Sequence, residues 1–196
     1  NYMDLSWLYS QIEHEFYEKG VEVNEENLVE IVEQAQNLYE VWRATILLMK
    51  YGTPEAIPTL QKAMYYPMQD VKITALGAIA AISKSDGCDL YISALKDPKY
   101  REKYTAVRAI YEYCDEGAIE PIIARIKQML SRTRRGIYYG MNNETEMTCA
   151  IAYLNKYSKS QDEILPLFAH ISDKWRFLWK HEQAYLTQHI EFFSGK

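Results

Sequence analysis

Apolar residues recur every three or four positions through most of the chain, which predicts α-helices. The first apolar face is formed by Leu5, Leu8, Ile12 and Phe16. Gly20 is placed to end this helix in a left-handed backbone conformation, and Asn24 can cap the next helix. Thr53 followed by Pro54 is a further typical helix start. Because no segment alternates with period two for long enough to form a sheet, we expect an all-α protein.

A pattern of small residues repeats along the chain. Ala75-x-x-Ala78-Ile79 returns 31 residues later as Ala106-x-x-Ala109-Ile110. Related copies begin at Ala44 and Ala150, and the last copy is displaced by a 13-residue insertion, residues 131–143. Each repeat reads as two helices joined by a short turn. One such pair cannot bury its apolar face alone, so the pairs are expected to stack.

The predicted organisation is a single domain over residues 1–196. Residues 1–23 form an N-terminal helix, and residues 24–158 form regular repeats with the insertion at 131–143. Residues 159–196 form a C-terminal capping pair, which includes a long helix from about Trp175 to Phe193. The predicted fold is a right-handed superhelix, or α-solenoid, of about five helix pairs plus the N-terminal helix.

Three turn and first-helix motifs resemble those of HEAT-repeat proteins of the short bacterial type. They are Ala56-Ile57-Pro58-x-Leu60, Leu95-Lys96-Asp97-Pro98 and Ala118-Ile119-Glu120-Pro121-Ile122. The resemblance covers residues 24–158 well and residues 159–196 poorly. It implies a scaffold that binds proteins through a concave surface lined by the second helix of each pair.

The charge of the chain is concentrated at its beginning. The net charge is −5, yet residues 1–40 hold ten acidic residues and one basic residue, Lys19. This segment would repel phosphate and attract a basic protein. The candidate partner-binding acids are Glu26, Glu30, Glu33 and Glu40. A solvated acidic face is the alternative, since glutamates also suit the start of a helix.

A second candidate surface lies in the middle repeat. Tyr100, Tyr104, Arg108 and Tyr111 fall away from the small-residue stripe of their helix. The resemblance would place them on the concave face, where tyrosine and arginine are common binding hot spots. Alternatively, the tyrosines pack against a neighbouring repeat.

The insertion is the third candidate. It carries the basic and aromatic residues Arg132, Arg134, Arg135, Tyr138 and Tyr139. Such residues could grip nucleic acid by phosphate contacts and stacking, or dock on an acidic protein. A solvated loop without a role is the third possibility.

Signals of catalysis are few. The chain has no HExxH motif and no glycine-rich phosphate loop. His14-Glu15 and His181-Glu182 resemble the ligand pairs of HEAT-like iron hydroxylases, which need four pairs. We therefore expect no enzyme activity, no metal and no cofactor.

The cysteines and hydropathy bear on location. Cys88, Cys114 and Cys149 are odd in number and far apart, which argues against a disulfide and favours core positions in a cytoplasmic protein. The sequence contains no run of 18 apolar residues, so it predicts no membrane span. The opening residues do not lead us to expect a signal peptide.

Small acidic repeat proteins of this type resemble immunity proteins, or antitoxins, that occlude a cognate toxin, often a basic nuclease. The hypothesis is therefore a non-catalytic protein-binding module whose partner is a basic toxin. The alternatives are a nucleic-acid binder such as a DNA glycosylase-like enzyme, and a general assembly scaffold.

Overall fold

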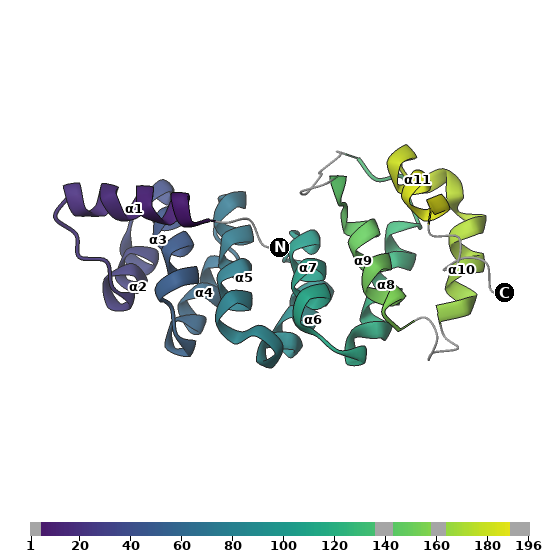
Figure 1. Cartoon of the computed structure of the whole chain (residues 1–196), viewed down its shortest axis with the longest axis horizontal. Helices are drawn as coiled ribbons and strands as arrows, with labels where there is room; N and C mark the ends of the chain where they lie inside the picture. The colour runs from purple at the N-terminus through teal and green to yellow at the C-terminus, as the bar shows by residue number, and fades with distance from the viewer. Residues whose placement is uncertain (1–4, 136–142, 158–163, 189–196) are drawn as a thin grey trace. The chain divides into compact units, whose positions relative to one another are not determined.

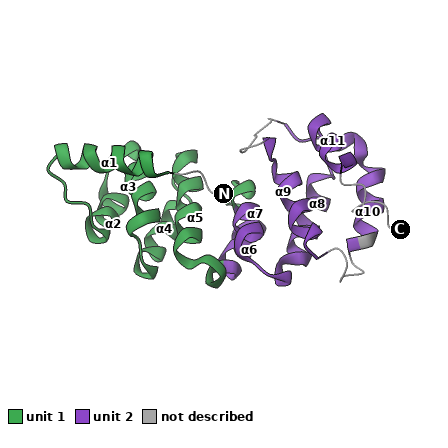
Figure 2. Cartoon of the chain, in the orientation of Figure 1, with its two compact units in different colours: residues 1–87, 98–105 green, residues 88–97, 106–196 purple. Residues whose placement is uncertain are grey.

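The computed structural model describes residues 5–135, 143–157 and 164–188. Every regular element within these ranges is a helix, which confirms the all-α prediction (Figure 1). The chain divides into two compact units (Figure 2). Unit 1 contains residues 1–87 and 98–105, and unit 2 contains residues 88–97 and 106–196.

Unit 1 is built around the third helix. Its elements are α1 (Ser6–Glu18), α2 (Glu25–Gln34), α3 (Leu38–Tyr51), the 3-10 turn η1 (Pro54–Ala56), α4 (Ile57–Ala63), α5 (Gln69–Ser83) and the 3-10 turn η2 (Lys84–Gly87). Helix α3 packs against α1, α2 and α5, and α4 packs against α5. Leu28, Leu47, Leu60 and Leu76 are fully buried in this core.

The helix ends of unit 1 follow the signals in the sequence. Gly20 has φ 70°, and the amides of Gly20 and Val21 donate to the carbonyls of Tyr17 and Phe16 at the end of α1. These two bonds form a Schellman motif, which satisfies carbonyls that the helix leaves without partners. The Asn24 side chain accepts from the Asn27 amide at 2.8 Å and caps α2. Thr53 caps η1, with Pro54 as its first residue.

Unit 2 contains the remaining helices. They are α6 (Cys88–Lys96), α7 (Lys103–Tyr113), the 3-10 turn η3 (Glu116–Ala118), α8 (Ile119–Met129), α9 (Glu146–Asn155), α10 (Ile164–Asp173), the 3-10 turn η5 (Trp175–Phe177) and α11 (Lys180–Gln188). The first three residues of α7 belong to unit 1. Helix α8 packs against α6, α9 and α10, and α9 packs against α11.

The prediction of a single long helix starting at about Trp175 is wrong. Trp175–Phe177 form a 3-10 turn, and Leu178 adopts an extended conformation before α11 begins at Lys180. The Glu182 carboxylate accepts from the backbone amide of Trp179 at 3.0 Å and so caps a new helix start. The last residues of the expected helix, 189–193, lie outside the described residues.

The small residues of the sequence pattern lie on helices and are buried. Ala44 belongs to α3, Ala75 to α5, Ala106 to α7 and Ala150 to α9, and each is fully buried. A small side chain at such a position lets a neighbouring element approach the helix closely. The pattern therefore predicted both helical structure and burial at these positions.

The expectation that the cysteines form no disulfide is wrong for two of them. Cys88 at the start of α6 and Cys114 after the end of α7 are joined by a disulfide, with their Cα atoms 5.6 Å apart. The turn between the two helices brings the start of the first helix and the end of the second together. Cys149 is a buried free thiol, as expected, and burial raises its pKa. With a disulfide present, the cysteines no longer favour the cytoplasm.

None of the helices in the described ranges combines the length and the apolar character that crossing a membrane requires.

Candidate functional site

Several acidic residues near the N-terminus hold α1 against α3. The Glu13 carboxylate accepts hydrogen bonds from the Lys50 ammonium at 2.6 Å and the Tyr51 hydroxyl at 2.7 Å. These hydrogen bonds, that from Lys50 foremost, lower the pKa of Glu13 below its ordinary value. Glu15 pairs with Arg43 at 2.8 Å. The charges of Glu13 and Glu15 are thus compensated by bases on α3.

Two of the four predicted binding acids also have partners within unit 1. Glu33 accepts from the Thr59 hydroxyl at 2.8 Å and from Lys62 at 3.3 Å, which together lower its pKa. These bonds join α2 to α4. Glu40 lies 3.6 Å from the ammonium of Lys19. The charge of both glutamates is therefore partly neutralised inside the chain.

The other two predicted acids, Glu26 and Glu30, are exposed on α2. They lie one helical turn apart, and exposed Glu22 precedes them in the turn before the helix. Among the described residues, no base forms an ion pair with any of the three. This group, Glu22, Glu26 and Glu30, is called the acidic group below. It leaves a local negative charge that no ion pair within the described part of unit 1 compensates.

An open hollow of about 560 Å³ lies beside the acidic group. It is lined by Gly20, Val21, Glu22, Asn27, Glu30, Ile31, Gln34 and Ala35. The lining residues that belong to α2 recur every three or four positions, so they share one face of the helix. The Asn27 amide group donates to the Glu22 carbonyl at 2.9 Å and ties the turn to α2. The residues that line the hollow thus combine apolar residues with two glutamates.

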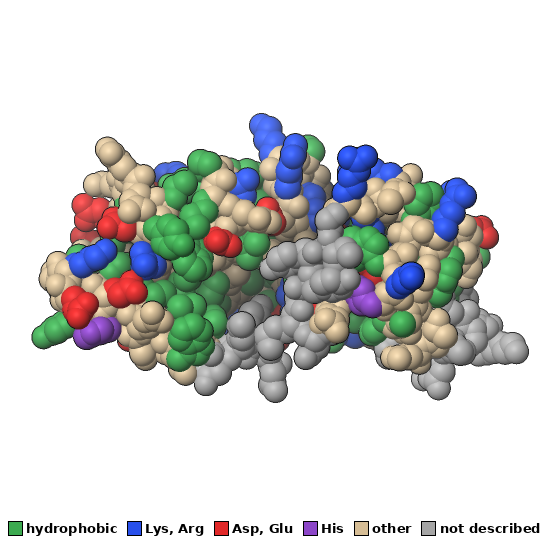
Figure 3. Space-filling view, turned by 90° about the horizontal axis from the view of Figure 1, so that it is seen from above, with side chains coloured by type: hydrophobic (Ala, Val, Ile, Leu, Met, Phe, Trp, Pro, Cys, Tyr) green, Lys and Arg blue, Asp and Glu red, His purple; other side chains and the backbone are tan. Residues whose placement is uncertain are grey.

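The outer face of α1 carries exposed aromatic side chains that the sequence reasoning missed. Trp7 is 64% exposed and Tyr17 is 80% exposed, whereas Ile12 and Phe16 on the opposite face are buried. His14 lies on the outer face and pairs with Glu18 at 3.2 Å. Figure 3, viewed from the side of α1, shows hydrophobic side chains gathered among charged ones over this part of the chain. The same 3.6-residue period that identified the inner face could have identified this outer one.

Tyr100 is a core residue, so the prediction that it anchors a partner on an exposed surface is wrong. It is fully buried, and its hydroxyl donates to the Lys72 carbonyl at 3.2 Å. Its ring meets the ring of Tyr65 edge to face, with centroids 6.2 Å apart. Burial raises the pKa of Tyr100. Tyr65 was not predicted as a surface residue, yet it is exposed beside this buried ring.

The other members of the predicted tyrosine surface are half-buried on α7. Tyr104 belongs to unit 1, and Arg108 and Tyr111 belong to unit 2. The Arg108 guanidinium lies 3.3 Å from Glu144 and 5.4 Å from the Tyr111 ring centroid. The Lys156 ammonium lies 4.0 Å from the same ring centroid. The Arg108 guanidinium and the Tyr111 ring are therefore engaged within unit 2.

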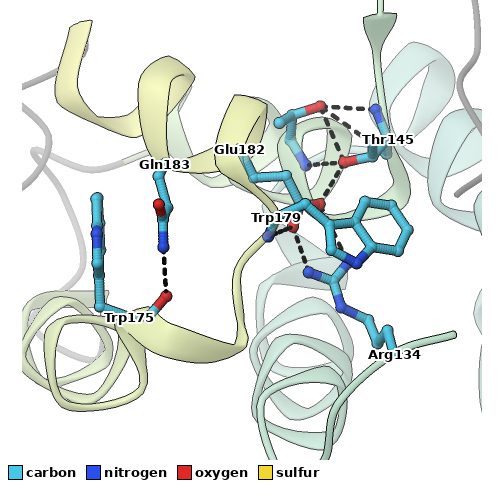
Figure 4. Close-up of polar contacts among 7 residues, drawn as sticks. Arg134, Thr145, Trp175, Trp179, Glu182 and Gln183 are labelled. Carbon is cyan, nitrogen blue, oxygen red and sulfur yellow. Dashed lines mark hydrogen bonds and ion pairs between the residues drawn. The ribbon is translucent and has the colours of Figure 1, made fainter.

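Arg134, one of the predicted loop arginines, is directed into unit 2. Its guanidinium forms two hydrogen bonds to the fully buried carboxylate of Glu182 and stacks 4.3 Å from the Trp179 ring centroid (Figure 4). The Thr145 hydroxyl donates to the same carboxylate at 2.6 Å. This arrangement satisfies a buried charge, and it engages the Arg134 guanidinium within unit 2.

The remaining insertion residues divide into described and undescribed ones. Arg132 and Arg135 are exposed, while Tyr138 and Tyr139 lie outside the described residues. Arg125, just before the insertion, pairs with Glu146. The basic stretch therefore presents fewer uncompensated charges than its sequence indicated.

In both His-Glu pairs considered as possible metal ligands, the glutamate forms an ion pair with an arginine. Glu15 pairs with Arg43, and Glu182 pairs with Arg134. Within the described ranges, no group of three or more metal-ligating side chains converges. The two pairs therefore supply no assembled set of metal ligands in the part of the chain that the structure describes.

The chain was compared with protein families and with characterised proteins. No protein-family model matches it, and no curated protein matches it. Proposals about its function therefore depend on its own residues and geometry.

Proposed function

We propose that this protein is a non-catalytic protein-binding module that neutralises a basic toxin, in the manner of an immunity protein. In this proposal its helix pairs stack as a right-handed α-solenoid of about five HEAT-like repeats plus the N-terminal helix. The observation that carries the proposal is the acidic group, whose three exposed carboxylates form no ion pair with any base in the part of the chain that the structure describes.

The contrast with neighbouring acids supports this proposal. Glu13, Glu15 and Glu33 each contact a base on another helix, and they stabilise the packing of unit 1. Glu22, Glu26 and Glu30 make no such ion pair among the described residues. Glu26 lies in the first turn of α2, where its charge suits the helix dipole, but ion pairing accounts for none of the three. Exposed charges of one sign steer an oppositely charged partner and suppress binding of like-charged ones.

The aromatic side chains of α1 supply a second feature of a binding surface. Trp7 and Tyr17 expose most of their surface, although each could bury a large apolar area. Tryptophan and tyrosine are the residue types most enriched among binding hot spots. In the proposed complex the acidic group directs the encounter, and these rings provide contact area.

Binding to nucleic acid receives less support. Of the arginines in and beside the insertion, Arg125 and Arg134 are paired with carboxylates. The acidic group would repel a phosphate backbone, which dominates affinity for nucleic acid. A general assembly scaffold would share the acidic surface but would have a partner without toxicity.

The test is a pull-down from lysate of the native host, treated with nuclease and repeated at raised salt. We expect one basic protein at near-equal stoichiometry, and we expect that protein to be toxic when expressed alone. The variant Glu22→Lys/Glu26→Lys/Glu30→Lys should lose this partner. A matched control is Asp89→Lys/Glu116→Lys/Glu120→Lys, which changes the same charge at exposed positions of unit 2 and should retain it.

Three outcomes would contradict the proposal. Recovery of nucleic acid alone would favour the arginine-rich insertion as the functional surface. Equal loss of the partner in both triple variants would show that net charge acts without a defined surface. A non-toxic partner would indicate that the protein is an assembly scaffold and not a toxin inhibitor.

A further inference from the structure

We propose that the hollow beside the acidic group binds an arginine side chain of the basic partner. The inference rests on the proposed function and extends it by naming the group that is recognised and the place where it binds. The hollow is lined by Val21, Ile31 and Ala35 as well as by Glu22 and Glu30. An occupant that complements both kinds of wall must have an apolar stem and a cationic end.

The apolar part of the hollow fits the stem of an arginine. Val21 and Ile31 are half-buried, so each leaves apolar surface in contact with solvent. Arginine buries its methylene groups along such surfaces while its charged head stays near water or an acceptor. Covering Val21 and Ile31 removes apolar surface from water without requiring the partner to bury its charge.

The polar part of the hollow fits a guanidinium better than an ammonium. Glu22 and Glu30 provide carboxylates, and Gln34 adds an amide oxygen at the same wall. A guanidinium presents five donors in a planar fork and can engage several acceptors at once. It is also less strongly hydrated than an ammonium, which favours entry into a partly apolar hollow.

The backbone of the turn beside the hollow is held before binding. The two backbone bonds at Gly20 and Val21 hold the turn, and Asn27 holds Glu22 through its carbonyl. A backbone turn that is already ordered loses less entropy on binding than a flexible one.

The experiment uses the full-length protein and a synthetic nine-residue peptide of alternating glycine and arginine. Binding is followed by NMR, through the methyl signals of Val21 and Ile31 and the amide signals of Gly20 and Gln34. We expect these signals to shift and saturate. A peptide with citrulline in place of arginine, which keeps the shape but removes the charge, should leave them unchanged, and a lysine peptide should bind more weakly.

The decisive comparison is between two exposed glutamates on one helix. Glu30 lines the hollow, whereas Glu26 is exposed four residues earlier and does not line it. Glu30→Gln should weaken binding about three- to five-fold, as expected for a solvent-accessible ion pair, and Glu26→Gln should weaken it less than two-fold. Ile31→Ser tests the apolar wall, with circular dichroism to verify that the variant is folded.

The results separate this inference from the proposed function. Equal weakening by Glu30→Gln and Glu26→Gln, or equal binding of the arginine and lysine peptides, would overturn the arginine site and leave diffuse attraction by the acidic group. Loss of the native partner in the triple lysine variant would then still support the proposed function. Shifts confined to residues outside the hollow would also overturn the inference.

Discussion

Arg134 and Glu182 form a buried ion pair that joins the segment before residues 136–142 to α11. The Glu182 carboxylate is fully buried and also accepts from the Thr145 hydroxyl and the Trp179 amide. Thr145 is itself the N-cap of α9. One carboxylate thus connects Arg134 and Thr145, which lie on either side of residues 136–142 in the sequence, to the start of α11 (Figure 4).

Replacing Arg134 should destabilise the protein strongly. Arg134→Met leaves the Glu182 charge buried without its cation, and removal of one partner of a buried pair costs about 3–5 kcal/mol. The measurement is the free energy of unfolding from denaturant titration. The double variant Arg134→Met/Glu182→Gln removes both charges and keeps a side-chain oxygen that can accept from Thr145 and Trp179, so it should recover much of the loss. If the double variant is no more stable than Arg134→Met, the ion pair is not the source of the effect.

Removing the Cys88–Cys114 disulfide should lower stability by about 3 kcal/mol, because the cross-link restricts the unfolded chain over a separation of 26 residues. The comparison is between oxidised protein and the Cys88→Ser/Cys114→Ser variant by denaturant titration.

Thiol labelling checks the connectivity. Protein purified under oxidising conditions and unfolded without reductant should bind label at Cys149 alone, and reductant should add two sites. Labelling of all three cysteines without reductant would contradict the disulfide.

Acid should weaken the contact between α1 and α3. The pKa of Glu13 is lower in the folded protein than its ordinary value of 4.5, because Lys50 and Tyr51 donate to its carboxylate. A lowered folded-state pKa gives stability that is complete above the ordinary value and is lost as pH falls through the folded value. The melting temperature should therefore fall as pH decreases below about 4.5. Glu13→Gln should melt lower at pH 7 and show a smaller fall; an unchanged pH profile would contradict this.

The helices and their ends could largely be predicted from the sequence, because these features depend on nearby residues. Gly20, Asn24 and Thr53 mark helix ends in the sequence and do so in the structure. The small residues at Ala75 and Ala106 are buried as their period indicated.

The candidate site was less predictable, because it depends on contacts between helices. Glu33 and Glu26 look alike in the sequence, and only the approach of α4 to α2 gives Glu33 its partners Thr59 and Lys62. Trp175 begins a 3-10 turn in place of a long helix because Glu182 caps a new start and Gln183 donates to the Trp175 carbonyl. The contacts of Glu33 have no local signal in the sequence, whereas Glu182 lies three residues after Trp179 and could have marked the new helix start.

Tyr100 and Tyr17 should respond in opposite ways to truncation. Tyr100→Ala removes a fully buried ring and should cost about 3–5 kcal/mol of unfolding free energy. Tyr100→Phe keeps the ring and loses the hydrogen bonding of the hydroxyl, including the bond to the Lys72 carbonyl, and should cost about 1 kcal/mol. Tyr17 is 80% exposed, so Tyr17→Ala should change stability by less than about 0.5 kcal/mol while weakening binding of the proposed partner. Unfolding free energies and partner affinities of the three variants test this. A stable Tyr100→Ala variant would return Tyr100 to the binding surface, and unchanged affinity in Tyr17→Ala would exclude that ring as a contact.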